Sequence, residues 1–331
     1  MNVRQDRAYT YCSIEKGFHI EPKGKKRYTR EHKMKVVVTH MRPDLDAVGS
    51  VWAIKRFLPN WEDAEVKFVP AGQKLGIEKP TESTQVIEKN GTDEVIHVDT
   101  GLGPLDHHQT GDDNTCAAKR SWQWAIHERG GSKPEIEAGD RLMDIVCEID
   151  HFKEVFWPEP ASDRYEITVS RILDGLKLLE KDDDAKIVEF GMTCLDSLYR
   201  AFQNKIWAER ELEEKGIEFT SVFGKGIGVE TFNDDIIHLS QRMGYNIAVR
   251  KDPKKGYIRI KASPAAVVGK GKKKGQIDLT PVYERLKEMD PDATWFLHVS
   301  KRMLLNGTTK NPTMKPTSLS LKKIVEVIKE I

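Results

Sequence analysis

Apolar positions near the start of the chain alternate between short continuous runs and helical spacing. The run VVV (36–38) is β-branched and typical of a strand buried on both faces. Apolar residues in DAVGSVWAIKRFLP (46–59) recur at helical spacing and end at a proline. A second strand is predicted at AEVKFVPA (64–71), a helix at TESTQVIEKNG (81–91) and a third strand at DEVIHVD (93–99). This order predicts a parallel sheet with helices on its faces.

The pattern changes twice further along the chain. Helical spacing dominates after residue 116 and is interrupted by the polar, proline-containing stretch WPEPASDRYE (157–166). From about residue 217 the period shortens, and YNIAVRKDPKKGYIRIKA (245–262) predicts a hairpin. We therefore expect an α/β protein in three parts: an N-terminal arm (1–33), a parallel doubly wound sheet domain (34–156), and a helical connector with a second, smaller α/β domain (157–331).

Composition limits the class of protein. The 53 basic and 52 acidic side chains nearly cancel, so the net charge does not indicate a nucleic-acid partner. The 4 cysteines are widely spaced without a Cys-x-x-Cys, which argues against a disulfide framework or a zinc ribbon. No apolar run approaches the ~20 residues that span a bilayer, and the first residues lack a signal-peptide pattern. We expect a cytoplasmic protein with no membrane partner.

Acidic and imidazole side chains follow the first and third predicted strands. His40, Asp44 and Asp46 lie in THMRPDLDAVGS (39–50), where the first strand runs into a helix, and Asp99 ends the third strand. Ligands of such sheets bind beyond the carboxyl ends of the strands, so both groups should lie at one edge. The alternative for the first group is a plain turn in which Asp46 caps the helix and His40 has no role.

A third group follows after a very short connection. Only TGLGPL (100–105) separates Asp99 from Asp106, His107 and His108, and its glycines and proline suit a tight reversal that brings His107 back toward Asp99. Imidazole nitrogens and carboxylates are the ligands that Mn, Fe, Zn and Co accept. Idle, exposed histidines would not explain why three such groups meet at one sheet edge. The sequence therefore predicts a metal site.

One more carboxylate would complete two metal positions. The stretch CEIDHF (147–152) offers Glu148, Asp150 and His151 on a predicted helix, and Asp144 lies six positions before Asp150. An acidic residue on a helix beside other polar residues is often only a surface charge. The spacing leaves both Asp150 and Asp144 open as the last ligand.

These motifs resemble those of a known superfamily. VVVTHMRPDLDAVGS, followed by VDT and LDHHQ, resembles the DHH phosphoesterases, which include RecJ-type exonucleases, nano-RNases, cyclic-dinucleotide phosphodiesterases and manganese-dependent inorganic pyrophosphatases. The proline before the first aspartate is similar to the pyrophosphatase form. The close pairing of VDTG with DHHQ is more similar to the melanocyte-proliferating-gene branch of metal-dependent RNA exonucleases, although that branch's His-x-Asp-Glu pattern is absent. The motifs cover roughly residues 34–151.

The resemblance implies a DHH-type fold with two divalent metal ions, Mn²⁺ in the first place and Mg²⁺, Co²⁺ or Fe²⁺ as alternatives. It implies the following ligands: His40 and Asp44 for one ion, Asp46, His107 and Asp150 for the other, and Asp99 bridging both. His108 would face the substrate phosphate, and Asp106 would orient an imidazole. Two such metals can bind one phosphoryl group and lower the pKa of a bridging water, so no protein nucleophile is required.

Candidate substrate contacts lie in the second domain. VVGKGKKKGQ (267–276) is a basic loop that could grip phosphates, although lysines in loops are often only solvated. Other side chains near the C-terminus could close over the metals. The substrate-binding candidates are Lys270, Lys272, Lys273, Lys274, His298, Lys301, Asn306 and Lys310.

The leading hypothesis is hydrolysis of phosphodiester bonds by metal-activated water. Its substrate would be a phosphorylated small molecule, such as a nucleotide, or a short single-stranded RNA. A manganese-dependent inorganic pyrophosphatase is one alternative, and a non-catalytic protein that senses metal or nucleotide is another. A homodimer is compatible with the sequence, which does not fix the oligomeric state.

Overall fold

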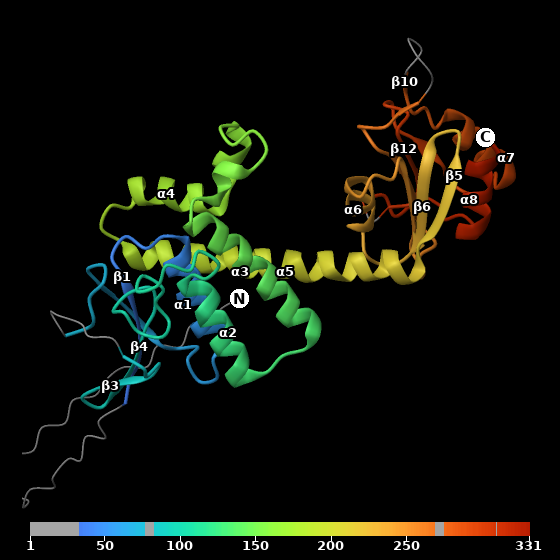
Figure 1. Cartoon of the computed structure of the whole chain (residues 1–331). Helices are drawn as coiled ribbons and strands as arrows, with labels where there is room; N and C mark the ends of the chain where they lie inside the picture. Colours follow the sequence, from blue (N-terminus) through green and yellow to red (C-terminus); the bar gives the residue numbers. More distant parts are fainter. Residues whose placement is uncertain (1–32, 77–82, 269–274, 309) are drawn as a thin grey trace, which may run out of the picture.

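The protein consists of two lobes joined by one long helix, α5 (Asp184–Lys215) (Figure 1). The computed structural model describes residues 33–76, 83–268, 275–308 and 310–331. The N-terminal arm predicted at 1–33 lies outside this range except for its last residue. The loop lysines predicted to bind substrate also lie outside it: Lys270, Lys272, Lys273 and Lys274.

A four-stranded sheet in the order β2-β1-β4-β3 forms the base of the first lobe. Its strands are β1 (Lys35–His40), β2 (Glu65–Val69), β3 (Glu88–Asn90) and β4 (Asp93–His97). β1 pairs in parallel with both β2 and β4, and its valines are buried, as the strand–helix alternation predicts. The carboxyl ends of β1 and β4 are therefore neighbours.

The helix predicted at 81–91 is wrong. Its described part contains β3 instead, which pairs antiparallel with β4 through Asn90 and Asp93. Gly91 adopts a positive φ of 61°, so it turns the chain into a hairpin and does not end a helix. Asn-Gly is favoured in short hairpin turns. The single apolar pair Val86-Ile87 is too short to give a helix the apolar stripe that it needs for packing.

Helices from distant parts of the sequence form the core of the first lobe. They are α1 (Leu45–Phe57), α2 (Ala117–Arg129), α3 (Lys133–Asp150), α4 (Val169–Leu179) and the first half of α5. Two 3₁₀ turns, Lys153–Phe156 and Asp163–Ile167, connect α3 to α4. The Trp52 ring stacks on Trp122 at 6.1 Å, and Trp52 Nε1 donates a 2.8 Å hydrogen bond to Asp196 of α5. A Cβ at Gly139 would come within 1.9 Å of the Trp122 ring, so the approach of α3 to α2 requires glycine.

The second lobe contains a six-stranded sheet in the order β11-β12-β8-β7-β6-β5. Only β6 and β7 pair in parallel, and β7 and β8 form the predicted hairpin. Its strands are β5 (Ile217–Ser221), β6 (Gly224–Glu230), β7 (Ile247–Lys251), β8 (Ile258–Ala262), β11 (Phe296–Leu297) and β12 (Met303–Asn306). Its helices are α6 (Ile236–Arg242), α7 (Thr280–Met289) and α8 (Leu321–Glu330). The α/β class predicted for both parts of the chain is thus confirmed.

The two faces of the second sheet are covered differently. α7 and α8 pack on one face, against Ile258 and Ile260 of β8. α6 and the end of α5 pack on the other face, over β6 and Ala248 of β7. Because successive strand residues point to opposite faces, Arg259 and Lys261 of β8 point to the α6 side. Each lobe therefore has a hydrophobic core of its own.

Candidate metal centre

Side chains at the carboxyl edge of the first sheet form a group of potential metal ligands. His40 is the last residue of β1, Asp99 follows β4, and the pairing of the two strands places them side by side. His40 Nε2 lies 3.1 Å from Asp99 Oδ2 and 3.9 Å from Asp44 Oδ2. These three side chains are close enough to share one cation.

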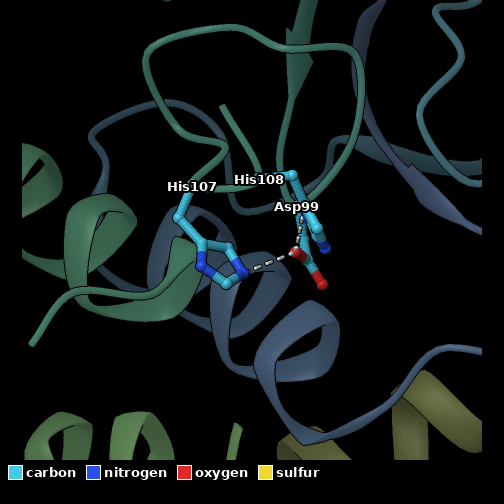
Figure 2. Close-up of side chains that lie close together, drawn as sticks. All are labelled: Asp99, His107 and His108. Atoms are coloured by element: carbon cyan, nitrogen blue, oxygen red, sulfur yellow. Dashed lines mark ion pairs between the residues drawn. The ribbon is translucent and has the colours of Figure 1, made fainter. Parts of the chain in front are cut away.

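His107 lies at the centre of a second group. Its Nε2 is 3.5 Å from Asp46 Oδ2, 3.7 Å from Asp99 Oδ1 and 3.5 Å from Asp150 Oδ2. Figure 2 shows His107 and His108 both directed toward Asp99, which belongs to both groups. Asp99 is thus placed where a ligand that bridges two ions would be.

The loop between Asp99 and His107 makes the reversal that its glycines predict. Asp99 itself has a positive φ of 53°, an uncommon backbone region that aspartate tolerates better than most residues. Gly101 has a φ of 81°, and a Cβ there would lie 2.7 Å from the Lys74 side chain. The Asp99 amide donates to the Leu105 carbonyl at 3.0 Å, which closes the loop.

The first two aspartates are each held by a helix N-terminus. Asp44, and not Asp46, is the N-cap of α1, because its Oδ1 accepts from the Ala47 amide at 3.0 Å. Asp46 instead accepts from the amides of Ala117 and Ala118 at 2.9 and 2.7 Å, at the start of α2. Free amides and the helix dipole both favour a carboxylate at such a position. These contacts fix the direction of the buried Asp46 side chain before any ion binds.

Two atoms at the centre of the cluster fit a metal ligand better than a hydrogen-bond partner. Asp99 Oδ1 and His107 Nε2 are buried and have no hydrogen-bond partner among the described residues. Buried polar atoms rarely remain unpaired, because each costs free energy. Atoms that bind one ion at about 2.1 Å lie roughly 3–3.5 Å from each other. The 3.5–3.7 Å spacings around His107 are close to that range, so the donor set fits divalent metal.

Without a cation the cluster is electrostatically unfavourable. Burial raises the pKa of Asp46 and of Asp99, and neighbouring carboxylates raise both pKa values further. Burial and then the charge of Asp44 raise the pKa of Asp150 to about 6. Burial and then the charge of His108 lower the pKa of His107 to about 4, so its imidazole is neutral at pH 7 and able to bind a metal.

His108 differs from His107 in exposure and in charge. Its side chain is 58% exposed, and its Nδ1 lies 2.7 Å from Asp106 Oδ1. That hydrogen bond raises the pKa of His108 to about 9, against the effect of burial. Burial opposes ionisation of Asp106, but hydrogen bonds from His108 outweigh it and lower the pKa of Asp106 to about 2. His108 is therefore a cation at pH 7 on the open side of the cluster.

The C-terminal end of α3 supplies the last carboxylate. Asp150 reaches the cluster, whereas Asp144 forms a 2.8 Å ion pair with Lys119 away from it. His151, which the sequence offered beside Asp150 but did not assign as a ligand, has its Nδ1 3.3 Å from Asp150 Oδ2 and forms a third group with His107 and Asp150. Its position next to Asp150 in CEIDHF was the only sequence signal.

The described substrate-binding candidates all belong to the second lobe, at the other end of α5 from β1 and β4 (Figure 1). Asn306 is fully buried, and its amide donates to the carbonyls of Thr294 and Lys315, so it holds the lobe together and offers nothing to a ligand. Lys301 pairs with Asp278 at 3.0 Å, and Lys310 is exposed in a turn. His298 lines a cavity, whose other side chains include Lys261 and His238.

The carboxylates should make the metal-free protein less stable as the pH rises. A carboxyl group whose pKa is raised in the folded chain stabilises the fold while it is protonated. This stabilisation is fully present below the pKa of the unfolded chain, near 4. It is lost as the pH rises through the pKa of the folded chain, which is about 6 for Asp150. Bound Mn²⁺ removes this loss. We expect Mn²⁺ to raise the melting temperature by roughly 5–10 °C at pH 7.5 and clearly less at pH 5. Thermal melts at both pH values check this, and an equal shift at both would contradict it.

Comparisons with known proteins give weak matches only. No protein-family model and no curated protein matches the chain. RecJ from Thermus thermophilus, solved in complex with Mg²⁺, is similar over 89% of this chain at 12% identity and a TM-score of 0.29. The match covers 49% of RecJ, so the chain spans about half of that protein. An exopolyphosphatase-related protein from Bacteroides fragilis is similar over 91% of this chain and 92% of its own, at 10% identity and a TM-score of 0.24.

No helix of the described residues combines the length and the apolar character that a membrane crossing requires. At the TM-scores given above, the structural similarities add nothing to the functional inference. The function therefore has to follow from the geometry of the chain's own side chains.

Proposed function

We propose that the chain is a DHH-type phosphohydrolase that uses two divalent metal ions, Mn²⁺ first among them, to hydrolyse phosphodiester bonds of short RNA or nucleotides. The observation that carries the proposal is the pair of unpartnered buried atoms, Asp99 Oδ1 and His107 Nε2, between three ligand groups that share residues. These two atoms lie 3.7 Å apart without a hydrogen bond, among carboxylates and imidazoles that one cation could bind together.

In this proposal His40 and Asp44 hold one ion, Asp46, His107 and Asp150 hold the other, and Asp99 is shared. Bound metal supplies an activated water and neutralises charge on the phosphoryl oxygens. His108 lies on the exposed side, where its proton can bind a phosphate oxygen or reach the leaving group. Asp106 keeps the proton on His108 and fixes the direction of the ring through Nδ1.

Metal analysis followed by a substrate panel tests the proposal. We expect about two ions per chain after reconstitution with Mn²⁺. We then expect Mn²⁺-dependent turnover of short RNA or of cyclic dinucleotides, with pyrophosphate cleaved more slowly. A chain with no more than trace metal after reconstitution would refute the metal centre. Fast turnover of pyrophosphate alone would instead identify an inorganic pyrophosphatase, and bound metal with no turnover of any substrate would indicate a sensing protein.

A further inference from the structure

Two cavities of the second lobe adjoin along α6. One, of about 520 Å³, lies between α5 and α6, and the other, of about 350 Å³, lies between α6 and the turn that joins β11 to β12. Both have His238 in their wall, so the two cavities adjoin at this side chain. α6 is on the side of the second lobe that faces the first lobe (Figure 1). We call the two cavities together the α6 groove, and its lining includes Phe202, His238, Leu239, Lys261, His298 and Arg302.

The strand end of the α6 groove carries positive charge without matching negative charge. Within the part of the chain that the structure describes, neither Lys261 nor Arg302 lies within ion-pair distance of a carboxylate. The nearby acidic groups have other partners: Asp234 pairs with Arg259 at 3.3 Å, and Asp278 with Lys301 at 3.0 Å. Two cations that line one cavity without a carboxylate partner favour the binding of an anion there.

His298 adds a hydrogen-bond donor at the same end. Its Nδ1 accepts from the Ser300 amide at 3.2 Å and lies 2.9 Å from the Ser300 hydroxyl. A backbone amide can only donate, so Nδ1 is the acceptor, and the neutral ring carries its proton on Nε2. His298 therefore presents an N–H beside an ammonium and a guanidinium. Guanidinium and ammonium groups together are a common set of phosphate ligands.

The helix end of the α6 groove has a different character. Phe202 of α5 and Leu239 of α6 are partly buried and give this half an apolar wall, which Lys205 and Arg242 border. Its carboxylate, Asp235, accepts a 2.6 Å hydrogen bond from Asn204 and is thereby held by α5. An apolar wall beside a cationic pocket fits a ligand with a flat ring at one end and a phosphate at the other.

We propose that the α6 groove binds a nucleotide, with a phosphate at Lys261, His298 and Arg302 and the base against Phe202 and Leu239. This binding requires no metal, so it goes beyond the proposed hydrolysis and can be tested apart from it. The nucleotide could be one end of an RNA substrate or a separate small effector, and both sources share the same chemistry.

Calorimetric titration of the full chain with AMP and with inorganic phosphate tests the proposal. The Asp99→Asn chain without added metal serves as the parent, so that phosphate cannot bind at a metal centre. We expect AMP to bind at millimolar concentrations or below, and Lys261→Ala with Arg302→Ala to weaken it about tenfold or more. Phe202→Ala should weaken AMP but not inorganic phosphate. Arg285→Ala, which removes an α7 arginine paired with Glu288, is the matched control and should change neither.

An Asp99→Asn chain that binds no AMP, or equal AMP affinity with and without Lys261 and Arg302, would overturn the proposal. Melting temperatures equal to that of the parent establish that the variants are folded. Kinetics of the Mn²⁺-loaded chain then distinguish the two sources. If the Lys261 and Arg302 substitutions raise KM for short RNA more than they lower kcat, the α6 groove binds one end of the RNA substrate. If AMP changes the turnover of a small phosphodiester in the parent but not in the Lys261 and Arg302 variant, the α6 groove binds a separate effector. If the chain has no hydrolytic activity, the binding experiment still decides this proposal.

Discussion

Asp99→Asn should lose both metal binding and hydrolysis while the chain remains folded. Asp99 is the one carboxylate that belongs to both groups, so its neutralisation weakens the site for two ions at once. Removing a residue that only supports a ligand typically costs about 10–100-fold in metal affinity or activity, so loss of a shared ligand should lower kcat by about a thousandfold or more. Elemental analysis after Mn²⁺ reconstitution and turnover on the substrate panel measure the two effects.

The stability of Asp99→Asn separates this explanation from unfolding. Burial raises the pKa of Asp99 in the metal-free chain, so an ionised carboxylate there destabilises the fold at pH 7.5. The neutral amide should therefore leave the metal-free melting temperature unchanged or higher. Asp144→Asn is the matched control, because that carboxylate lies on α3 but pairs with Lys119 outside the cluster. Normal turnover in Asp99→Asn, or equal metal loss in Asp144→Asn, would show that the metal centre does not depend on Asp99.

His108→Gln should lower turnover by about 10²–10⁴-fold while the metal content stays near that of the parent. His108 is exposed and makes its shortest contact to Asp106, whereas His107 lies among Asp46, Asp99 and Asp150. His107→Gln should therefore show the opposite result, with early loss of metal. Metal analysis and kcat measured on the same preparations give the comparison. If His108→Gln releases metal and His107→Gln keeps it, the two assignments are reversed.

Asp106→Asn tests how His108 acts. The Asp106 hydrogen bond is the main cause that raises the pKa of His108 to about 9, so the amide variant should hold the proton less tightly. If turnover needs protonated His108, the fall in activity on the alkaline side should begin at a lower pH in Asp106→Asn than in the parent. A pH–rate profile on the parent and the variant shows the direction of the change. If the alkaline side of the pH–rate profile is unchanged in Asp106→Asn, Asp106 stabilises the loop that carries His108 and does not control the protonation of His108.

The convergence at the metal centre could be predicted because it depends on local order in the sequence. His40 ends β1 and Asp99 lies two residues after the end of β4, and strand order alone brings such residues to one edge of the sheet. The choice between Asp144 and Asp150 could not be made, since it depends on how α3 is rotated against α2. That rotation depends on the contact of Gly139 with Trp122, a tertiary fit that spacing does not reveal.

The second lobe was less predictable because its surface chemistry comes from cross-strand neighbours. Lys261 of β8 lies opposite Met303 of β12, and neither position was marked by a motif. Asn306 looked available to a ligand, yet its three hydrogen bonds join segments that are distant in the sequence. β3 was missed because its few residues depend on β4 for their strand geometry.

The cores of the two lobes are separate, and α5 joins them within the described residues, which has a consequence for cooperativity. A chain that has one continuous core melts as a single unit, whereas two cores that share a helix can unfold in two steps. The proposed metal centre lies in the first lobe, so bound metal should raise the melting temperature of the first lobe and leave that of the second lobe unchanged. A single melting temperature would then describe neither lobe, and the calorimetric enthalpy would exceed the van't Hoff value more in the metal-loaded chain than in the metal-free one.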